Sequence, residues 1–313
     1  MVKYILKRLV QLVVVLLGVT FLTFMITQAA PSDAAEMKYV SMGMMPSAEL
    51  LEKTREEMGL NDPVLIQYGR WLCNVLHGDL GESSKFGESV LTQMTRKLPM
   101  TLKLAGVSLV AVILISFPLG VLSAVKKNKA ADYIIRFLSF FGVSMPNFWL
   151  ALLLMYIFAV RLGWFKVVST DSIQGMILPV ATLTIPMISS YARQIRAALL
   201  EELNANYVIG ARARGIPERR IIWGHVLPNA ILPIITLLGL SVGHLLGGAA
   251  IIETIFSWQG IGNMVVEAIR VRDYPLIQGY VIWMAIIYVT VNLIVDISYR
   301  CLDPQIRLRK RVD

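Results

Sequence analysis

The chain has 313 residues, of which 56% are hydrophobic and only 16% are charged, and its formal net charge at neutral pH is +9. Soluble domains carry about 25% charged residues, and a mean hydropathy of +0.63 lies outside their usual range. This composition excludes an ordinary soluble domain and predicts an all-α integral membrane protein.

A membrane-spanning helix needs roughly 20 apolar residues, because the hydrocarbon layer is about 30 Å thick and a helix rises about 1.5 Å per residue. The first such stretch follows Lys3, Lys7 and Arg8, as in a secretory signal. Its apolar part exceeds the roughly 7–15 residues of a signal core, which predicts an uncleaved anchor. About six stretches are long enough, at Leu9–Thr27, Thr101–Val125, Ile134–Val160, Ile177–Ile195, Ile231–Ile252 and Leu276–Ile297.

The region after the first span is predicted to form a small helical cap outside the membrane. Ser47 is a favourable N-cap for a helix that ends near Gly59, and Asp62-Pro63 opens a second helix toward His77-Gly78. The predicted organisation is a cytoplasmic N-terminus with the first span at 1–29, an extracytoplasmic helical region at 30–98, a transmembrane core at 99–300 with a cytoplasmic segment at 196–230, and a basic cytoplasmic tail at 301–313.

The distribution of cations predicts the orientation, because inner loops are enriched in Lys and Arg. With a cytoplasmic N-terminus, the inner segments hold 18 Lys and Arg residues and the short outer loops hold 4. Both termini are therefore expected in the cytoplasm. The topology and attraction to anionic membrane lipid explain the positive charge, so no nucleic-acid partner is needed.

Several kinds of chemistry have no motif here. No GxxxxGK[ST] phosphate loop occurs, so the chain is not expected to hydrolyse ATP by itself. His77, His225 and His244 do not form a metal-ligand spacing, and Cys73 and Cys301 are predicted on opposite sides of the membrane. No nucleophile and base can be paired. The sequence thus predicts a non-catalytic chain that binds no cofactor of its own.

A polar segment, NYVIGARARGIPERRIIWGHVLPNA (Asn206–Ala230), interrupts this apolar chain between the fourth and fifth spans. Ala205–Arg214 has a helix-forming composition, Gly215 ends it, and Pro217 can begin a second helix. An apolar face, a basic face and several small residues are typical of an element that rests at an interface and fits a partner's groove. An ordinary solvated basic loop is the alternative. Its candidate contact residues are Tyr207, Ala211, Arg212, Ala213, Arg214, Gly215, Leu227 and Pro228.

The residues ARARG followed by HVLPNA resemble the cytoplasmic coupling loop, or EAA loop, of the permease subunits of ATP-binding-cassette (ABC) importers, in its dipeptide, oligopeptide and nickel version. The motif's glycine falls on Gly215, its second alanine on Ala211 and its closing Leu-Pro on Leu227-Pro228, whereas Ile209 and Gly210 replace its glutamate and first alanine. Five other stretches of the chain resemble sequence blocks of the same family and occur in the same order. They are HGDLGES, LPMTLKLA, GVSMPNFW, IETIFSWQGIG and RDYPLIQG.

This resemblance implies the type I permease fold of ABC importers and a multi-pass location in the bacterial inner membrane. It implies a second homologous permease as partner, two ABC ATPase subunits that bind ATP and Mg, and an extracytoplasmic solute-binding protein. Closure of the ATPases would then move the coupling loop and switch the spans between inward and outward openings.

The fifth predicted span carries small residues at regular spacing and one ionisable group. Gly239, Gly243 and Gly247 form a face that allows close helix packing. His244 lies beside this face, and an ionisable residue inside a span is costly and often marks a pathway. His244 is therefore a candidate for the pathway and for a metal ligand, with plain packing as the alternative.

Three further polar residues are pathway candidates. Asn147 lies in the third span, where Pro146 is expected to kink the helix. Glu253 and Asp273 are predicted at the outer mouth, where an interfacial ion pair is the alternative for each.

The substrate is predicted as nickel or a nickel chelate, because the outer region and GVSMPNFWLA look most like the nickel branch of the family. His244 and the methionines of MKYVSMGMM also suit a transition metal. An importer of di- or oligopeptides is the alternative. An ion-coupled secondary transporter is a remoter one, because no inverted repeat is visible and such a machine has no use for the coupling pattern.

Overall fold

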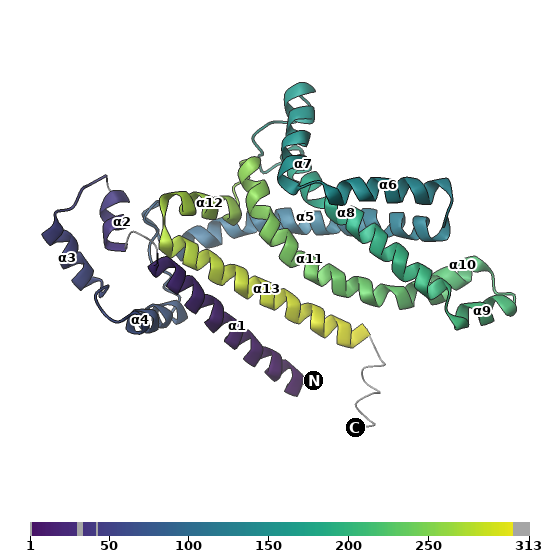
Figure 1. Ribbon diagram of the computed structural model, residues 1–313, viewed down its shortest axis with the longest axis horizontal. Coiled ribbons are helices and arrows are strands. Elements are labelled where there is room, and N and C mark those ends of the chain that lie inside the picture. Colours follow the sequence, from purple (N-terminus) through teal and green to yellow (C-terminus); the bar gives the residue numbers. More distant parts are fainter. Residues whose placement is uncertain (1, 30–33, 42, 303–313) are drawn as a thin grey trace. The chain divides into compact units, whose positions relative to one another are not determined.

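A computed structural model of the chain describes residues 2–29, 34–41 and 43–302, and these fold almost entirely into helices (Figure 1). The all-α prediction is confirmed. In chain order the elements are α1 (Val2–Gln28), α2 (Ala34–Ser41), α3 (Ala48–Glu57), α4 (Val64–Leu76), α5 (Val90–Val125), α6 (Ala130–Ser144), α7 (Asn147–Leu154), the π-helical segment η1 (Met155–Arg161), α8 (Ile173–Leu203), α9 (Asn206–Ala213), α10 (Glu218–Ile221), the π-helical segment η2 (Ile222–Val226), α11 (Leu227–Ile255), α12 (Ile261–Val271) and α13 (Tyr274–Leu302).

The described residues belong to two compact units. The first lies within Met1–Thr101 and Gln259–Val289, and the second within Leu102–Trp258 and Thr290–Asp313. The organisation predicted from the sequence follows the sides of the membrane, which is a different kind of division, and it stays a prediction.

Among the described residues, four helices are long and apolar enough to cross a membrane. They are Val10–Gln28, Val90–Val125, Ile173–Leu203 and Tyr274–Val295. The stretch predicted as a fifth span lies within α11, where the side chains of several residues are outside the described set.

The third predicted span, in which a kink at Pro146 was expected, is broken into two helical halves. Its two halves, Ala130–Ser144 and Asn147–Arg161, are bent by 104° at the Met145-Pro146 step. Pro146 has no backbone N–H to donate and restricts the residue before it to extended conformations, so Met145 leaves the helix with ψ 127°. The proline signal was read correctly, but a kink was expected where the helix breaks.

In the first unit, the cap helices begin and end where the sequence predicts. The Ser47 hydroxyl accepts a hydrogen bond from Leu50 N at 3.2 Å, and Gly59 follows α3 with φ 65°. The second helix, α4, packs on α1 through aromatic residues: the rings of Phe24 and Trp71 lie 5.6 Å apart. An apolar core formed by α5, α12, α13 and the loop before α5 lies in the same unit.

In the second unit, α5 buries a single stripe of its surface. The buried residues are Leu104, Ala105, Ser108, Val112, Ser116, Gly120, Ser123 and Ala124. This spacing of three and four residues is that of one helical face.

Two glycines allow helices of the second unit to approach α8 closely. A Cβ on Gly120 of α5 would lie 2.6 Å from Ile195, and one on Gly142 of α6 would lie 2.1 Å from the Ser189 hydroxyl. Small residues at such contacts let helix backbones approach each other. The sequence reading missed both positions.

The second unit keeps its basic segments at one end. Asp132, just after the Lys126–Lys129 loop, pairs with Arg196 near the end of α8, and α9 and α10 follow that end directly. At the other end, Ser169 N donates to Phe256 O at 2.8 Å, and Lys103 pairs with Asp171. The 126–129 loop and the segment that follows α8, both of which the charge count places in the cytoplasm, are thus on the same side of this unit.

Candidate functional site

The segment predicted to couple to a partner forms two short helices joined by a turn, as expected. Helix α9 ends at Ala213, and Gly215 follows it with φ 73°, a left-handed conformation that glycine adopts without steric cost. Pro217 is the N-cap of α10, and η2 then leads into α11. We call residues 206–226 the coupling element.

One face of the coupling element is built into the core of the second unit. Val208 and Ala211 of α9, Ile221 of α10 and Val226 of η2 are buried in one apolar cluster with Ile195 and other residues of α8. Leu227, which closes the motif, packs against this cluster, while Pro228 is exposed at the start of α11. The coupling element is therefore packed against the end of α8.

The opposite face of the coupling element is exposed and carries small residues. Gly210 and Gly215 have no atoms within 4 Å of where a Cβ would lie, and Ala213 and Arg214 are exposed beside them. Next to these small residues, two large apolar side chains stand in the open, with Ile209 and Trp223 each 57% exposed. Clustered exposed apolar groups are typical of surfaces that contact another protein or the membrane.

An exposed ion pair links the two short helices. Arg212 at the end of α9 donates from Nε to Glu218 Oε2 at 3.1 Å and from Nη2 to Glu218 Oε1 at 2.5 Å. This bidentate hydrogen bonding lowers the pKa of Glu218 and raises that of Arg212. Arg212 and Arg214 are both exposed, but Arg212 is paired within the element, whereas Arg214 has no ion pair among the described residues.

Tyr207, one of the candidate contact residues, is exposed next to buried Val208. Its hydroxyl donates to Glu202 Oε2 at 2.5 Å, which ties α9 back to the end of α8. Burial, and then this hydrogen bond, raise the pKa of Tyr207.

A buried carboxylate beside the coupling element was not identified from the sequence. Asp132 Oδ1 accepts from Ser123 Oγ at 2.5 Å and from Arg196 Nε at 2.7 Å, and Oδ2 accepts from Arg196 Nη2 at 2.8 Å and from Asn128 N at 2.9 Å. This clamp joins α5, α6 and α8, the helix that carries the coupling element. One feature of the sequence could have indicated Asp132: it is an acidic residue in the first turn of a helix that follows a basic loop.

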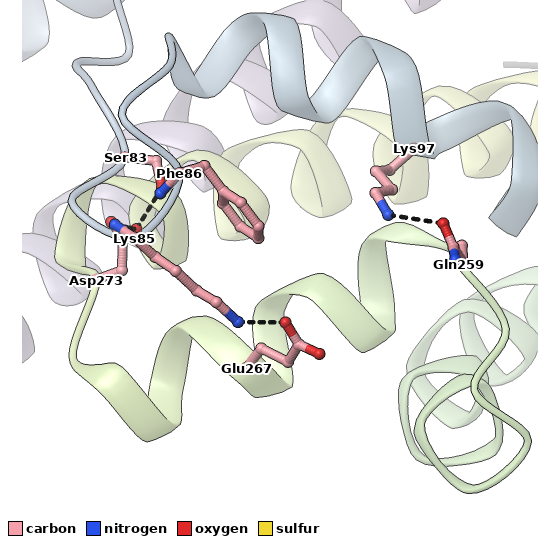
Figure 2. A network of polar contacts seen from close by, with 7 residues as sticks. All are labelled: Ser83, Lys85, Phe86, Lys97, Gln259, Glu267 and Asp273. Carbon is pink, nitrogen blue, oxygen red and sulfur yellow. Dashed lines mark hydrogen bonds and ion pairs between the residues drawn. The ribbon is translucent and has the colours of Figure 1, made fainter.

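In the first unit, a polar network joins the HGDLGES loop to α12 (Figure 2). Buried Asp273 accepts from Ser83 Oγ at 2.5 Å and from Lys85 N at 3.1 Å, and Ser83 Oγ in turn accepts from Phe86 N at 3.1 Å. The Lys85 ammonium pairs with Glu267, which Figure 2 shows on α12.

The same network continues at the start of α12, where Figure 2 shows Lys97 reaching toward Gln259. Lys97 Nζ donates to Gln259 Oε1 at 3.4 Å, and Ile261 N donates to Thr101 Oγ1 at 2.9 Å. The loop, α5 and α12 are thereby fastened together within this unit.

We expect Asp273→Ala to destabilise the first unit, because it leaves the Ser83 hydroxyl and the Lys85 N–H without their acceptor. Each buried group left unsatisfied costs about 1–3 kcal/mol. Thermal unfolding of the purified protein measures the loss. The control is Glu267→Gln, which removes only a half-exposed pair and should cost less than about 1 kcal/mol. An equal effect of the two variants would contradict an anchoring role for Asp273.

The pathway candidates are distributed over both units. Asn147 is exposed at the first position of α7, after the break, and Glu253 is fully buried near the end of α11. Both belong to the second unit, whereas Asp273 belongs to the first. The side chain of His244 lies outside the described residues, so its roles in the pathway and as a metal ligand stay predictions.

The glycine face of α11 is exposed at Gly247. No described atom lies within 4 Å of a Cβ built on Gly247. Gly243 is half-buried, and Gly239 is outside the residues whose burial is described. Helix packing at these glycines stays a prediction.

Two family models match almost the whole chain. Residues 116–308 match the binding-protein-dependent transport system inner membrane component, and residues 1–105 match the N-terminal part of the membrane component of the same systems. The coupling element lies within the first match.

Curated relatives match over nearly their full length. The chain is 38% identical to the oligopeptide transport system permease protein AppB of Bacillus subtilis (strain 168), over 98% of this chain and 99% of that protein. It is 37% identical to the dipeptide transport system permease protein DppB of Alkalihalophilus pseudofirmus, over 98% and 100%. It is 35% identical to the glutathione transport system permease protein GsiC of Salmonella paratyphi A, over 99% and 100%.

Solved structures share the fold. The inward-facing MetNI methionine ABC transporter matches with a TM-score of 0.54 and 18% identity, over 68% of this chain and 97% of that chain. An amino acid ABC transporter crystallised with histidines matches with a TM-score of 0.53 and 19% identity, over 67% and 94%. The type I permease fold predicted from the resemblance is confirmed. The chain belongs to the binding-protein-dependent transport system inner membrane components, and is an inner-membrane permease of the ABC importer type.

Proposed function

We propose that this chain is the permease subunit of an importer of short peptides, and that separate ATPase subunits drive it through the coupling element. The proposed coupling to the ATPase subunits is supported by the two different faces of residues 206–226. One face is buried in the core of the second unit, and the other presents small residues and exposed apolar side chains.

The exposed side chains support a protein partner rather than solvent at this face. Trp and other large apolar residues are common anchors of protein interfaces, and the same element also exposes several cations. Arg214, Arg219 and Arg220 are exposed and have no ion pair among the described residues. An acidic rim on the ATPase around an apolar groove would complement this surface.

The peptide substrate replaces nickel as the favoured interpretation. The curated relatives matched over their full length are named as oligopeptide, dipeptide and glutathione permeases. The prediction of nickel rested on the look of two sequence blocks and on histidine and methionine residues, all of which a peptide permease can also carry. The alternative of an ion-coupled secondary transporter is set aside, because the chain belongs to a binding-protein-dependent family.

A second permease is proposed as the other half of the pathway. Gly247 on α11 presents an open surface that no described part of this chain covers. Small residues on a spanning helix allow another helix to approach closely, and a homologous subunit would supply one. A solute-binding protein is proposed on the outer side, where it would deliver the peptide.

Uptake measurements test the substrate. In membrane vesicles with the assembled complex, its binding protein and ATP, we expect uptake of a labelled dipeptide or tripeptide and no ATP-dependent uptake of radioactive nickel. A complex assembled without its ATPase subunits is the control. ATP-dependent nickel uptake without peptide uptake would contradict the proposal.

Cysteine labelling tests the orientation. In a background with Cys73→Ser and Cys301→Ser, we expect Lys127→Cys to react with an impermeant reagent only from inside. Exposed Glu49 in α3 is the matched outer position, and Glu49→Cys should react only from outside. The opposite pattern would contradict a cytoplasmic coupling element.

His244 can be tested without knowing where its side chain lies. His244→Leu keeps the bulk of the side chain and removes the imidazole. If His244 lines the pathway, we expect an assembled complex with ATPase activity but reduced peptide uptake. Uptake equal to that of the parent would assign His244 to packing.

A further inference from the structure

A basic groove on the surface of the second unit is not used by the coupling element. It lies between α6 and α8, which run side by side in Figure 1, and its volume is about 760 Å³. This is within the range of roughly 300–1,000 Å³ found for sites of small molecules. Three arginines and three aromatic rings line most of it, namely Arg136, Arg193, Arg196, Tyr133, Phe137 and Phe140.

The three arginines lie at a similar level along α6 and α8. Asp132 pairs with Arg196, and Gly142 faces Ser189, so α6 and α8 are antiparallel. Arg136 is four residues, about 6 Å, beyond Asp132, and Arg193 is three residues, about 4.5 Å, before Arg196. All three are therefore within about two turns of the end of α6 that follows the Lys126–Lys129 loop. With that loop in the cytoplasm, this is the level of the inner lipid headgroups.

The groove carries positive charge that the described part of the chain does not neutralise. Arg136 and Arg193 are exposed and have no carboxylate partner there. Arg136 lies over the ring of Tyr133, 5.8 Å from its centroid. Arg196 uses its Nε and Nη2 groups on Asp132, and a guanidinium has five N–H donors, so others remain to bind an anion.

The apolar part of the groove extends from these cations along α6. Phe137 and Phe140 are both exposed, and Phe137 is one residue beyond Arg136. An anionic head beside arginines and an apolar tail along phenylalanines is the arrangement that an anionic phospholipid requires. A protein partner would need carboxylates at the same depth, close to the hydrocarbon layer, where they are costly.

We propose that this groove binds one anionic phospholipid of the inner leaflet. Its phosphodiester is held by Arg136, Arg193 and the remaining donors of Arg196, and an acyl chain lies along Phe137 and Phe140. The proposal depends on the orientation of the chain in the membrane and not on the transported substrate. Arginine suits this role because its planar donors match phosphate oxygens in pairs.

The test measures phospholipid retained by the full complex after purification in detergent, with native mass spectrometry as the readout. The probes are phosphatidylglycerol and phosphatidylcholine with the same acyl chains. The groove variant is Arg136→Gln with Arg193→Gln, which leaves the Asp132–Arg196 pair intact. The matched control is Lys126→Gln with Lys127→Gln, which removes two exposed cations from the adjacent loop.

We expect the parent and the control to retain one phosphatidylglycerol per copy of this chain in preference to phosphatidylcholine. The groove variant should retain at least about tenfold less phosphatidylglycerol for each arginine removed, because each arginine contributes hydrogen bonds to a charged group. Inorganic phosphate at the same concentration as the lipid should not displace it. If the groove variant does not fold and insert into the membrane, Arg136→Lys with Arg193→Lys replaces it, with a smaller expected loss because the paired geometry is gone but the charge is kept.

Four results would overturn the proposal. Unchanged retention by the groove variant, or by the lysine variant used in its place, would show that the lipid does not bind there. Equal losses in the groove variant and the control would indicate general surface charge. Displacement by inorganic phosphate would assign the site to free phosphate. Loss of the second permease from the groove variant would make the groove a protein interface.

Discussion

Gly210→Trp is expected to abolish ATP-driven uptake, with a loss of at least about 100-fold, while the permease still folds and inserts. Gly210 is helical, exposed and has open space where its side chain would begin, so an indole causes no clash within this chain. It would, however, stand between the coupling element and a closely fitted ATPase. Loss of more than about 2.7 kcal/mol of coupling or binding free energy corresponds to this factor. Peptide uptake and ATPase co-purification are the measurements.

A graded series at the same position separates fit from folding. Gly210→Ala should leave uptake near that of the parent, because alanine is small and favours the helix by up to about 1 kcal/mol relative to glycine. Gly69→Trp on α4, also helical and exposed with open space, is the control for the indole itself. Normal uptake by Gly210→Trp would contradict an ATPase docked on this face. Gly215 is less suited to this test, because its left-handed backbone makes any side chain costly.

Asp132→Ala is expected to have the largest effect on stability. The Asp132 side chain is 0% exposed and that of Arg196 is 18% exposed, so removing the carboxylate leaves a guanidinium without its counter-charge. Breaking such a buried pair costs roughly 3–5 kcal/mol. In a domain of this size, each kcal/mol lowers the melting temperature by about 2–4 °C, so a fall of about 10 °C is expected.

The matched control is an exposed pair in the same unit. Asp171, whose side chain is 54% exposed, pairs with Lys103, and Asp171→Asn should cost less than about 1 kcal/mol. Thermal unfolding of the purified complex, followed by intrinsic fluorescence, gives both values. Equal melting temperatures for the parent and Asp132→Ala would show that the clamp does not hold α5, α6 and α8 together.

Local signals in the sequence predicted the two short helices and the turn of residues 206–226 correctly. A glycine that can adopt positive φ and a proline that can begin a helix are chemical requirements of the turn itself, and Gly215 and Pro217 meet them. The same holds for Ser47 and Gly59 at the two ends of α3. Such features depend on neighbouring residues only, so one sequence is enough to find them.

Features that depend on distant residues were missed or only partly predicted. Asp132 and Arg196 are 64 residues apart, and nothing near either residue identifies its partner. Gly120 and Gly142 are isolated glycines whose importance comes from the helix that packs on them, whereas the regular series at Gly239, Gly243 and Gly247 was easy to see. The 104° break was underestimated because Pro146 sets only the interruption, and the packing of both halves on α8 sets the angle.

Site-specific photocrosslinking most directly tests the claim that the coupling element receives the ATPase. A photoreactive amino acid replaces exposed Ile209 on α9 in the assembled complex, and Trp164, exposed in the loop after η1, is the matched control. We predict that the probe at position 209 captures the ATPase subunit, and that the probe at position 164 does not. Capture of the ATPase from position 164, or its absence at position 209 in a complex that is active in uptake, would contradict the account.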